Sequence, residues 1–472
     1  MPIVHKTDGS EASQEYLQAI LLCYSTAENP GPSEDAAFLA QALDGDELAI
    51  FMVELFSRWV DTGSNKSKRW VLYATAIHGG APIVKRFYRQ IQEWLKLSRS
   101  VFAAAAVTAL SLNPNLEALL TLDDMARSFK SKRVREAARE ALENTAARLG
   151  ISREELDDRM VPDLGFNESM ERIFDYGGRS FTVTVTPALT LQVSDENGRK
   201  LKNLPTAGKL DDPEKAGAAR EDFAQLKQQI KAVTDTQKKR LETALFVRRS
   251  WDADTWKSLF VSNPIMHQFA INLIWGLYKD DRLVQSFRYM EDGSFNTENE
   301  EEYEFLDEGR IALVHPAEMT DASLLKWMRQ LEDYEIKQPI LQLERPFRRM
   351  EENELNWNTL ERFQGCQLNE VLFDRNLLKM GWLRGNTESG GAFYTYFRQD
   401  KPSDFRVKLH FSGSVNKSDG NNEITVYHAD FYRVGADNED QAMLLKDVPP
   451  GYFSEIVMQL ERIVAPSTAF RI

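Results

Sequence analysis

The chain changes its hydrophobic periodicity near residue 160, and this change limits the folds that it can adopt. Between Ser13 and Gly150, apolar residues recur at the three- and four-residue spacing of amphipathic helices, with short breakers between segments. From Phe181 onward, apolar and polar residues alternate as they do in half-buried strands. We therefore predict an α+β protein with two domains, an all-α region over 1–160 and a mixed α+β domain over 161–472. A division of the second domain into two lobes near residue 350 is left open.

The end of the helical region carries the pattern of a stacked repeat. Two amphipathic segments, 115–129 and 134–149, are joined by a tight link. The small residues of 134–142 (VREAAREAL) form a face that lets helices approach closely, and this stretch resembles the second helix of a HEAT repeat. Such a helix pair buries its apolar face only by stacking on its neighbours. We predict a HEAT-like helical-repeat region that presents a surface to partners; an ordinary helical bundle is the alternative.

The second domain is predicted to contain antiparallel strands and one long helix. A three-strand meander is expected over 181–204, with a hairpin turn at Asn197-Gly198. Asp212-Pro213-Glu214 is a helix start, and an apolar stripe extends the helix to about Arg249. Further helices are expected at 251–278, 322–334, 356–378 and 452–464. Further strands are expected at 283–290, 310–314, 393–397, 405–411 and 423–432.

Charge and cysteine content narrow the compartment and the partners. The net charge of −14 disfavours nucleic acid, because an acidic chain is repelled by phosphate backbones. Binding through the basic turns at 66–69 and 130–135 remains as a third hypothesis. The chain has only two cysteines, no apolar run near the roughly 20 residues of a membrane span, and no apolar segment typical of a signal peptide at its N-terminus. We expect a cytoplasmic protein that does not bind membranes.

No motif in the sequence predicts a catalytic, metal or cofactor site. None of the six histidines lies in an HxH, HExxH or Cys/His cluster, so a zinc site has no sequence support. The phosphate-binding loop, the dinucleotide-binding glycine pattern and the GxSxG elbow are also missing. We therefore predict no catalytic residues, no metal and no cofactor, and we favour a function other than catalysis.

The densest run of polar and aromatic residues lies between Arg310 and Arg349. Imidazole, amide and guanidinium groups next to rigid prolines can form a fixed donor and acceptor surface for a ligand or a partner. The alternative is that these groups satisfy backbone atoms at strand and helix ends. The candidate residues are Arg310, His315, Trp327, Gln338, Gln342 and Arg345.

An ordered set of short motifs gives the second domain a family resemblance. The motifs begin at Asp175-Tyr-Gly and include the segments 195–205, 311–316, 334–339 and 381–385. This set resembles the C-terminal region of bacterial MolR-like proteins, which contain the domain of unknown function 4132, and it covers about residues 160–472. Some members also carry a WGR domain, which we do not find here.

The resemblance implies partners rather than chemistry. The family is associated with MoxR-type AAA+ ATPases and von Willebrand A proteins, and it brings no catalytic residues to carry over. We therefore predict a non-catalytic interaction or adaptor protein that acts with such a partner. The alternative is an enzyme or small-ligand-binding module with a site around His315–Arg345.

Overall fold

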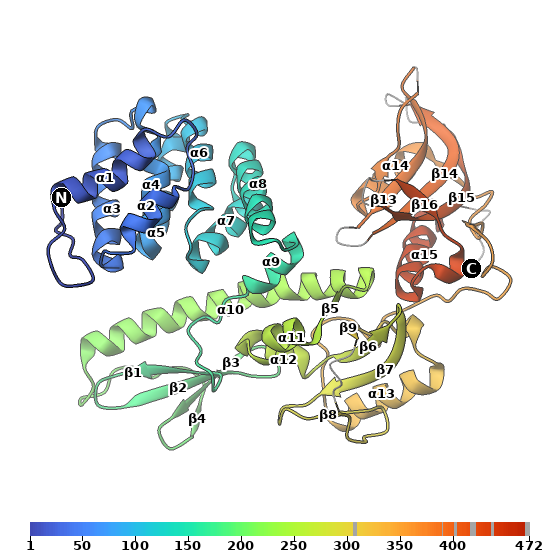
Figure 1. Cartoon of the computed structure of the whole chain (residues 1–472). Helices are drawn as coiled ribbons and strands as arrows, with labels where there is room; N and C mark the ends of the chain where they lie inside the picture. The colour runs from blue at the N-terminus through green and yellow to red at the C-terminus, as the bar shows by residue number, and fades with distance from the viewer. Residues whose placement is uncertain (305–308, 389, 401–403, 416–421, 436–438, 468–472) are drawn as a thin grey trace. The chain divides into compact units, whose positions relative to one another are not determined.

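A computed structural model describes residues 1–304, 309–388, 390–400, 404–415, 422–435 and 439–467. The chain divides into two compact units, Met1–Val161 and Pro162–Ile472. The first unit contains helices, and the second combines helices with three antiparallel sheets (Figure 1).

The first unit consists of helices of two to five turns joined by short links. Polar caps define several starts: the Ser131 side chain accepts from the Val134 N–H, and Gly150 ends the same helix in the left-handed conformation at φ 67°. The helices are α1 (Gln14–Ser25), α2 (Glu34–Ala40), α3 (Gly45–Asp61), α4 (Trp70–His78), α5 (Gly80–Lys96), α6 (Ser100–Leu110), α7 (Leu116–Ser128), α8 (Lys132–Leu149) and α9 (Arg153–Arg159).

Three successive helix pairs of this unit stack in two layers. Within the pairs, α3 packs on α4, α5 on α6 and α7 on α8. Between pairs, α3 packs on α5 and α5 on α7, while α4 packs on α6 and α6 on α8. The core between the layers contains Phe56, Trp59, Trp94 and Phe102, with the Trp59 and Trp94 ring centroids 6.1 Å apart. Each pair therefore buries its apolar face against its neighbours.

The second unit begins with a four-stranded antiparallel sheet next to the long helix. The strands β1 (Glu171–Asp175), β2 (Ser180–Val185), β3 (Leu191–Asp195) and β4 (Lys200–Leu201) pair in sequence order. The predicted meander lacked β1, whose burial pattern is too irregular to signal a strand. Helix α10 (Pro213–Val247) is continuous over 35 residues and is capped by Asp212. Neither α10 nor any other helix of the described residues is long and apolar enough to cross a membrane.

A five-stranded sheet with the order β5-β9-β6-β7-β8 follows. Its strands are β5 (Ser250–Trp251), β6 (Ile274–Lys279), β7 (Arg282–Tyr289), β8 (Phe295–Asn296) and β9 (Arg310–Leu313), and its helices are α11 (Ala253–Trp256), the π-helical turn η2 (Lys257–Val261), α12 (Pro264–Ala270) and α13 (Asp321–Asp333). The predicted helix over 251–278 was wrong for its last turns, because 274–278 form the central strand β6. That strand is buried on both faces and therefore shows no alternation.

The third sheet has seven strands and one face covered by helices. Its main order is β10-β15-β14-β13-β12, with β11 and β16 also paired to β15. The strands are β10 (Thr359–Leu360), β11 (Gln367–Asn369), β12 (Leu383–Arg384), β13 (Ala392–Gln399), β14 (Phe405–Val415), β15 (Glu423–Val434) and β16 (Asp440–Ala442), and the helices are α14 (Glu370–Lys379) and α15 (Pro450–Val464).

The core of this third sheet fixes which residues face outward. Phe411 of β14 contacts Phe373 of α14 at 5.5 Å between ring centroids, and Phe431 of β15 contacts Phe453 of α15 at 6.0 Å. Because strand side chains alternate between faces, the even-numbered residues of β14 up to 410 and of β15 from 428 point away from these helices. The predicted helix over 356–378 was wrong before 370, because Gly365 takes φ 83° and two short strands precede α14.

Candidate functional site

An open cleft lies in the second unit between α10, α13 and the segment that follows α13. Its volume is about 1490 Å³, and the residues that line it lie at 238, 242, 325–326, 328–329, 331–332 and 335–344. Leu325, Met328 and Leu341 expose apolar side chains there, with 66%, 37% and 49% of their surface accessible. Basic side chains at 238, 326, 329 and 337 and acidic side chains at 242, 332, 335 and 344 also line the cleft. The cleft therefore combines apolar contact area with a charged rim.

Two of the six predicted residues, Gln338 and Gln342, line this cleft. The Gln342 side chain is nevertheless fully buried, and its Nε2 donates to the carbonyl oxygens of Ile274 at 2.7 Å and Val314 at 3.0 Å. Its Oε1 accepts from the Ile274 N–H at 3.0 Å and from Gln338 Nε2 at 2.7 Å. Both amide hydrogens and both lone pairs of Gln342 are thus used, and three of the four bonds tie the segment after α13 to Ile274 of β6 and to Val314 after β9.

Two more predicted residues, His315 and Arg345, meet at Glu455 of α15. His315 Nε2 lies 3.4 Å from Glu455 Oε1, and Arg345 Nη1 lies 2.7 Å from the same oxygen. Arg345 also pairs with Glu242 of α10. Burial raises the pKa of Glu455, but the His315 contact and the Arg345 charge outweigh burial and leave this pKa below its ordinary value. The arrangement links α10, the segment after α13 and α15 through ionised groups.

The remaining two predicted residues lie elsewhere. Arg310, at the start of β9, donates from Nε and Nη2 to the side chain and carbonyl of Ser250. Trp327 of α13 is buried, and its indole N–H donates to Ser286 Oγ at 2.9 Å. The described lining of the cleft includes neither of them, nor His315 or Arg345. The structure thus divides the six residues among four places, and their role as a ligand or partner surface stays a prediction.

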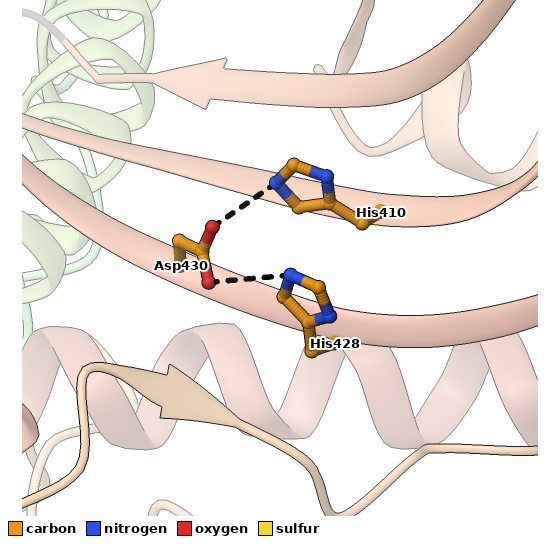
Figure 2. A group of neighbouring side chains, drawn as sticks. All are labelled: His410, His428 and Asp430. Atoms are coloured by element: carbon orange, nitrogen blue, oxygen red, sulfur yellow. Dashed lines mark ion pairs between the residues drawn. The ribbon is translucent and has the colours of Figure 1, made fainter.

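A group of side chains on the seven-stranded sheet was not predicted from the sequence. His410 of β14 and His428 of β15 are directly opposed in the strand register, and their rings stack with centroids 4.5 Å apart. Asp430 lies two residues after His428 and so shares its face. His410 Nε2 lies 3.1 Å from Asp430 Oδ2, and His428 Nε2 lies 3.6 Å from Asp430 Oδ1 (Figure 2). Both imidazoles therefore direct the same nitrogen toward one carboxylate.

The surroundings of Asp430 hold its carboxylate in place. The Tyr432 hydroxyl donates to Asp430 Oδ2 at 3.2 Å. Burial and the Asp430 charge raise the pKa of Tyr432 to about 12, so this hydroxyl keeps its proton at neutral pH. Lys408, directly across from Asp430, pairs instead with Asp440 of β16 at 2.5 Å. The ammonium group of Lys408 is thus paired with the Asp440 carboxylate and not with that of Asp430.

The sequence contained part of the signal for this group. The predicted strands 405–411 and 423–432 already place His410 on one polar face, and His428 with Asp430 on another. Bringing the two faces together needs the strand register, which changes beside His410 at an irregularity between His410 and Phe411. Motif spacing along the chain cannot supply a register across two strands. A search for His-x-Asp on predicted strands would have identified His428 and Asp430 but not His410.

Comparisons with known proteins agree with part of the family resemblance. The family model described as "Domain of unknown function (DUF4132)" matches residues 198–382. The uncharacterized protein YehI of Escherichia coli (strain K12) is 32% identical over 321 residues, which cover 67% of this chain and 26% of YehI. This chain therefore spans about a quarter of the length of that relative. No solved structure matches the chain.

The family match can be placed on the fold. Residues 198–382 begin at the turn before β4 and end after α14, so they contain α10, the five-stranded sheet and the whole cleft. His410, His428 and Asp430 lie beyond the matched residues. The part of the chain that is similar to the DUF4132 family is thus the part that forms the cleft.

Proposed function

We propose that this chain is a non-catalytic interaction protein, an adaptor that binds a segment of a partner protein in the cleft between α10 and α13. The observation that carries the proposal is the cleft itself. Its volume of about 1490 Å³ exceeds the roughly 300–1,000 Å³ of typical small-molecule sites. Leu325, Met328 and Leu341 offer apolar anchor points at its surface, and the charged rim suits a polar protein surface.

The chemistry of the lining supports binding over catalysis. Along the described walls of the cleft there is no serine, threonine, cysteine or histidine. These side chains are common nucleophiles and proton carriers in catalysis, and the lysine and glutamate side chains of the lining give it charge for polar contacts. The amide of Gln342 is fully engaged by backbone groups and by the Gln338 side chain. The cleft thus offers shape and apolar area, which serve recognition.

The helices of the first unit would provide a second surface for the partner protein. Its three helix pairs in two layers fit a HEAT-like repeat, an architecture that presents extended surfaces to partners. The resemblance to MolR-like proteins makes a MoxR-type AAA+ ATPase or a von Willebrand A protein the partner to test. An adaptor would engage such a partner while contributing no chemistry of its own.

The alternative, an enzyme or small-ligand-binding module with a site around His315–Arg345, has less support. His315 is 1% exposed, and its Nδ1 accepts from the Ala317 N–H at 3.1 Å. Arg345 is held by Glu242 and Glu455. A ligand would have to displace these contacts before it could bind.

The proposal is tested by binding of the full chain to a purified MoxR-type ATPase and a purified von Willebrand A protein from the same cell. We expect biolayer interferometry to detect one of them, and Leu325→Asp and Leu341→Asp to weaken binding at least tenfold, equivalent to about 1.4 kcal/mol. The matched control is Leu210→Asp, because Leu210 is 91% exposed and lies outside the cleft. Failure of both proteins to bind the wild type, or equal weakening by the control, would contradict the proposal.

A further inference from the structure

The His410, His428 and Asp430 group has the composition and spacing of a metal site. Each residue offers one ligand atom, and the three atoms lie within 4.8 Å of one another. Imidazole nitrogens and a carboxylate oxygen are ligands that zinc and related divalent transition metals prefer. Zinc binds them at about 2.0–2.2 Å in tetrahedral geometry, which places ligand atoms about 3.3 Å apart. The separation is 3.1 Å from His410 Nε2 to Asp430 Oδ2 and 3.6 Å from His428 Nε2 to Asp430 Oδ1. Both lie near this value, and because they end on different oxygens, the carboxylate would turn to present one of them to a shared ion.

The polar atoms that face one another here lack the hydrogen bonds that would otherwise explain the cluster. His410 Nε2 and Asp430 Oδ1 are both buried, and neither makes a hydrogen bond to another described residue. His410 Nε2 approaches Asp430 Oδ2 without hydrogen-bonding geometry. Their contacts within the cluster are the ion pairs of Asp430 with the two histidines. Because buried polar atoms are nearly always hydrogen-bonded as well, both atoms have capacity for a further ligand. A cation between them would satisfy both.

The support around the cluster matches that of a metal site. All three residues lie on the two central strands of the seven-stranded sheet, which restricts their backbones. Tyr432 donates to Asp430 Oδ2 and leaves Oδ1 without a hydrogen bond, as outer hydrogen bonds orient carboxylate ligands in metal sites. The side chains of His410 and His428 remain 29% and 34% exposed, so an ion can enter from solvent.

We propose that His410 Nε2, His428 Nε2 and an oxygen of Asp430 bind one divalent first-row transition-metal ion, with Zn²⁺ as the ion to test. Three protein ligands leave at least one coordination position open to water or to a group of another molecule. The site lies outside the cleft and the matched DUF4132 residues, so it is independent of the adaptor proposal.

The test is titration of the chelator-treated full chain with Zn²⁺ by isothermal titration calorimetry. We expect one equivalent to bind to the wild type, and His410→Gln and His428→Gln to weaken binding at least tenfold. Two variants are matched controls: His5→Gln removes an imidazole from the first unit, and Cys23→Ser removes a partly exposed thiol. Both controls should bind as the wild type does. Absence of Zn²⁺ binding by the wild type, or unchanged binding by both cluster variants, would overturn the proposal.

A second measurement on the wild type covers the case in which a cluster variant fails to fold. Co²⁺ bound by two imidazoles and one carboxylate should give visible d–d absorption without the near-ultraviolet band of a cobalt–thiolate bond. Zn²⁺ should abolish this absorption in competition, and excess Mg²⁺ should not, because Mg²⁺ prefers an octahedral shell of oxygen ligands. A thiolate band, or displacement of Co²⁺ by Mg²⁺, would show that another site binds the metal.

Discussion

Replacing Gln342 with leucine should destabilise the second unit strongly, although the two side chains have similar volumes. The substitution removes the partner of the buried Ile274 N–H and that of the Val314 carbonyl. Each buried polar group left without a partner costs about 1–3 kcal/mol, and we expect a total near 3 kcal/mol. This is a large part of the roughly 5–15 kcal/mol by which domains are usually stable.

Hydrogen exchange followed by mass spectrometry measures this effect locally. Peptides that cover β6 should exchange on the order of 100-fold faster in Gln342→Leu than in the wild type, since 1.4 kcal/mol corresponds to tenfold. Gln228→Leu, the same substitution at an exposed position of α10, should leave β6 unchanged. Exchange of β6 within threefold of the wild type would refute a structural role for Gln342 and return it to the candidates for ligand binding.

Two further substitutions test the packing inside each unit, one in the first unit and one in the second. Burial lowers the pKa of His78 to about 4, so the unfolded first unit binds more protons than the folded one below pH 6.5. The free energy of unfolding should therefore be full above pH 6.5 and fall by about 2–3 kcal/mol as the pH drops to 4. Denaturant titrations of His78→Gln should show a flatter dependence on pH. Gly276→Ala should destabilise the second unit by about 1–3 kcal/mol, because its new Cβ would lie 2.5 Å from a Leu283 methyl group and 2.7 Å from one of Val314. A lower denaturation midpoint of the variant would agree with this prediction, and an unchanged midpoint would show that β6 adapts to the added methyl group.

Local sequence signals predicted the helices and strands that have clear capping residues or a clear alternation of apolar and polar residues. The start of α10 at Pro213 follows from a cap, a preset φ and an acidic first turn, and the structure confirms this helix as far as Val247. Alternation likewise predicted β2, β14 and β15, whose inner faces pack on a core while their outer faces stay polar. In these segments the local pattern and the tertiary environment require the same conformation.

The errors arose where tertiary burial removes the pattern. β6 is buried on both faces and reads as a continuous apolar run, which periodicity cannot distinguish from a buried helix. Residues 356–369 carry apolar residues at helical spacing, yet Gly365 and pairing with β15 make this stretch a loop with two short strands. Neither partner strand can be identified from the segment itself.

The candidate site shows the same limit. The sequence marked Gln338 and Gln342 by their place in a polar run with prolines, and the structure places both at the cleft. It did not predict the apolar wall, because Leu325 and Met328 look like ordinary members of an amphipathic helix. It also did not predict His410 beside His428, since the register that joins them is a property of the sheet.

Hydrogen exchange of the full chain with and without a purified MoxR-type ATPase or von Willebrand A protein tests the cleft as the adaptor surface most directly. We predict that the bound partner slows exchange in residues 325–344, and that Leu341→Asp abolishes this protection. A partner that binds while exchange in 325–344 stays unchanged would contradict the assignment of the cleft as the docking surface.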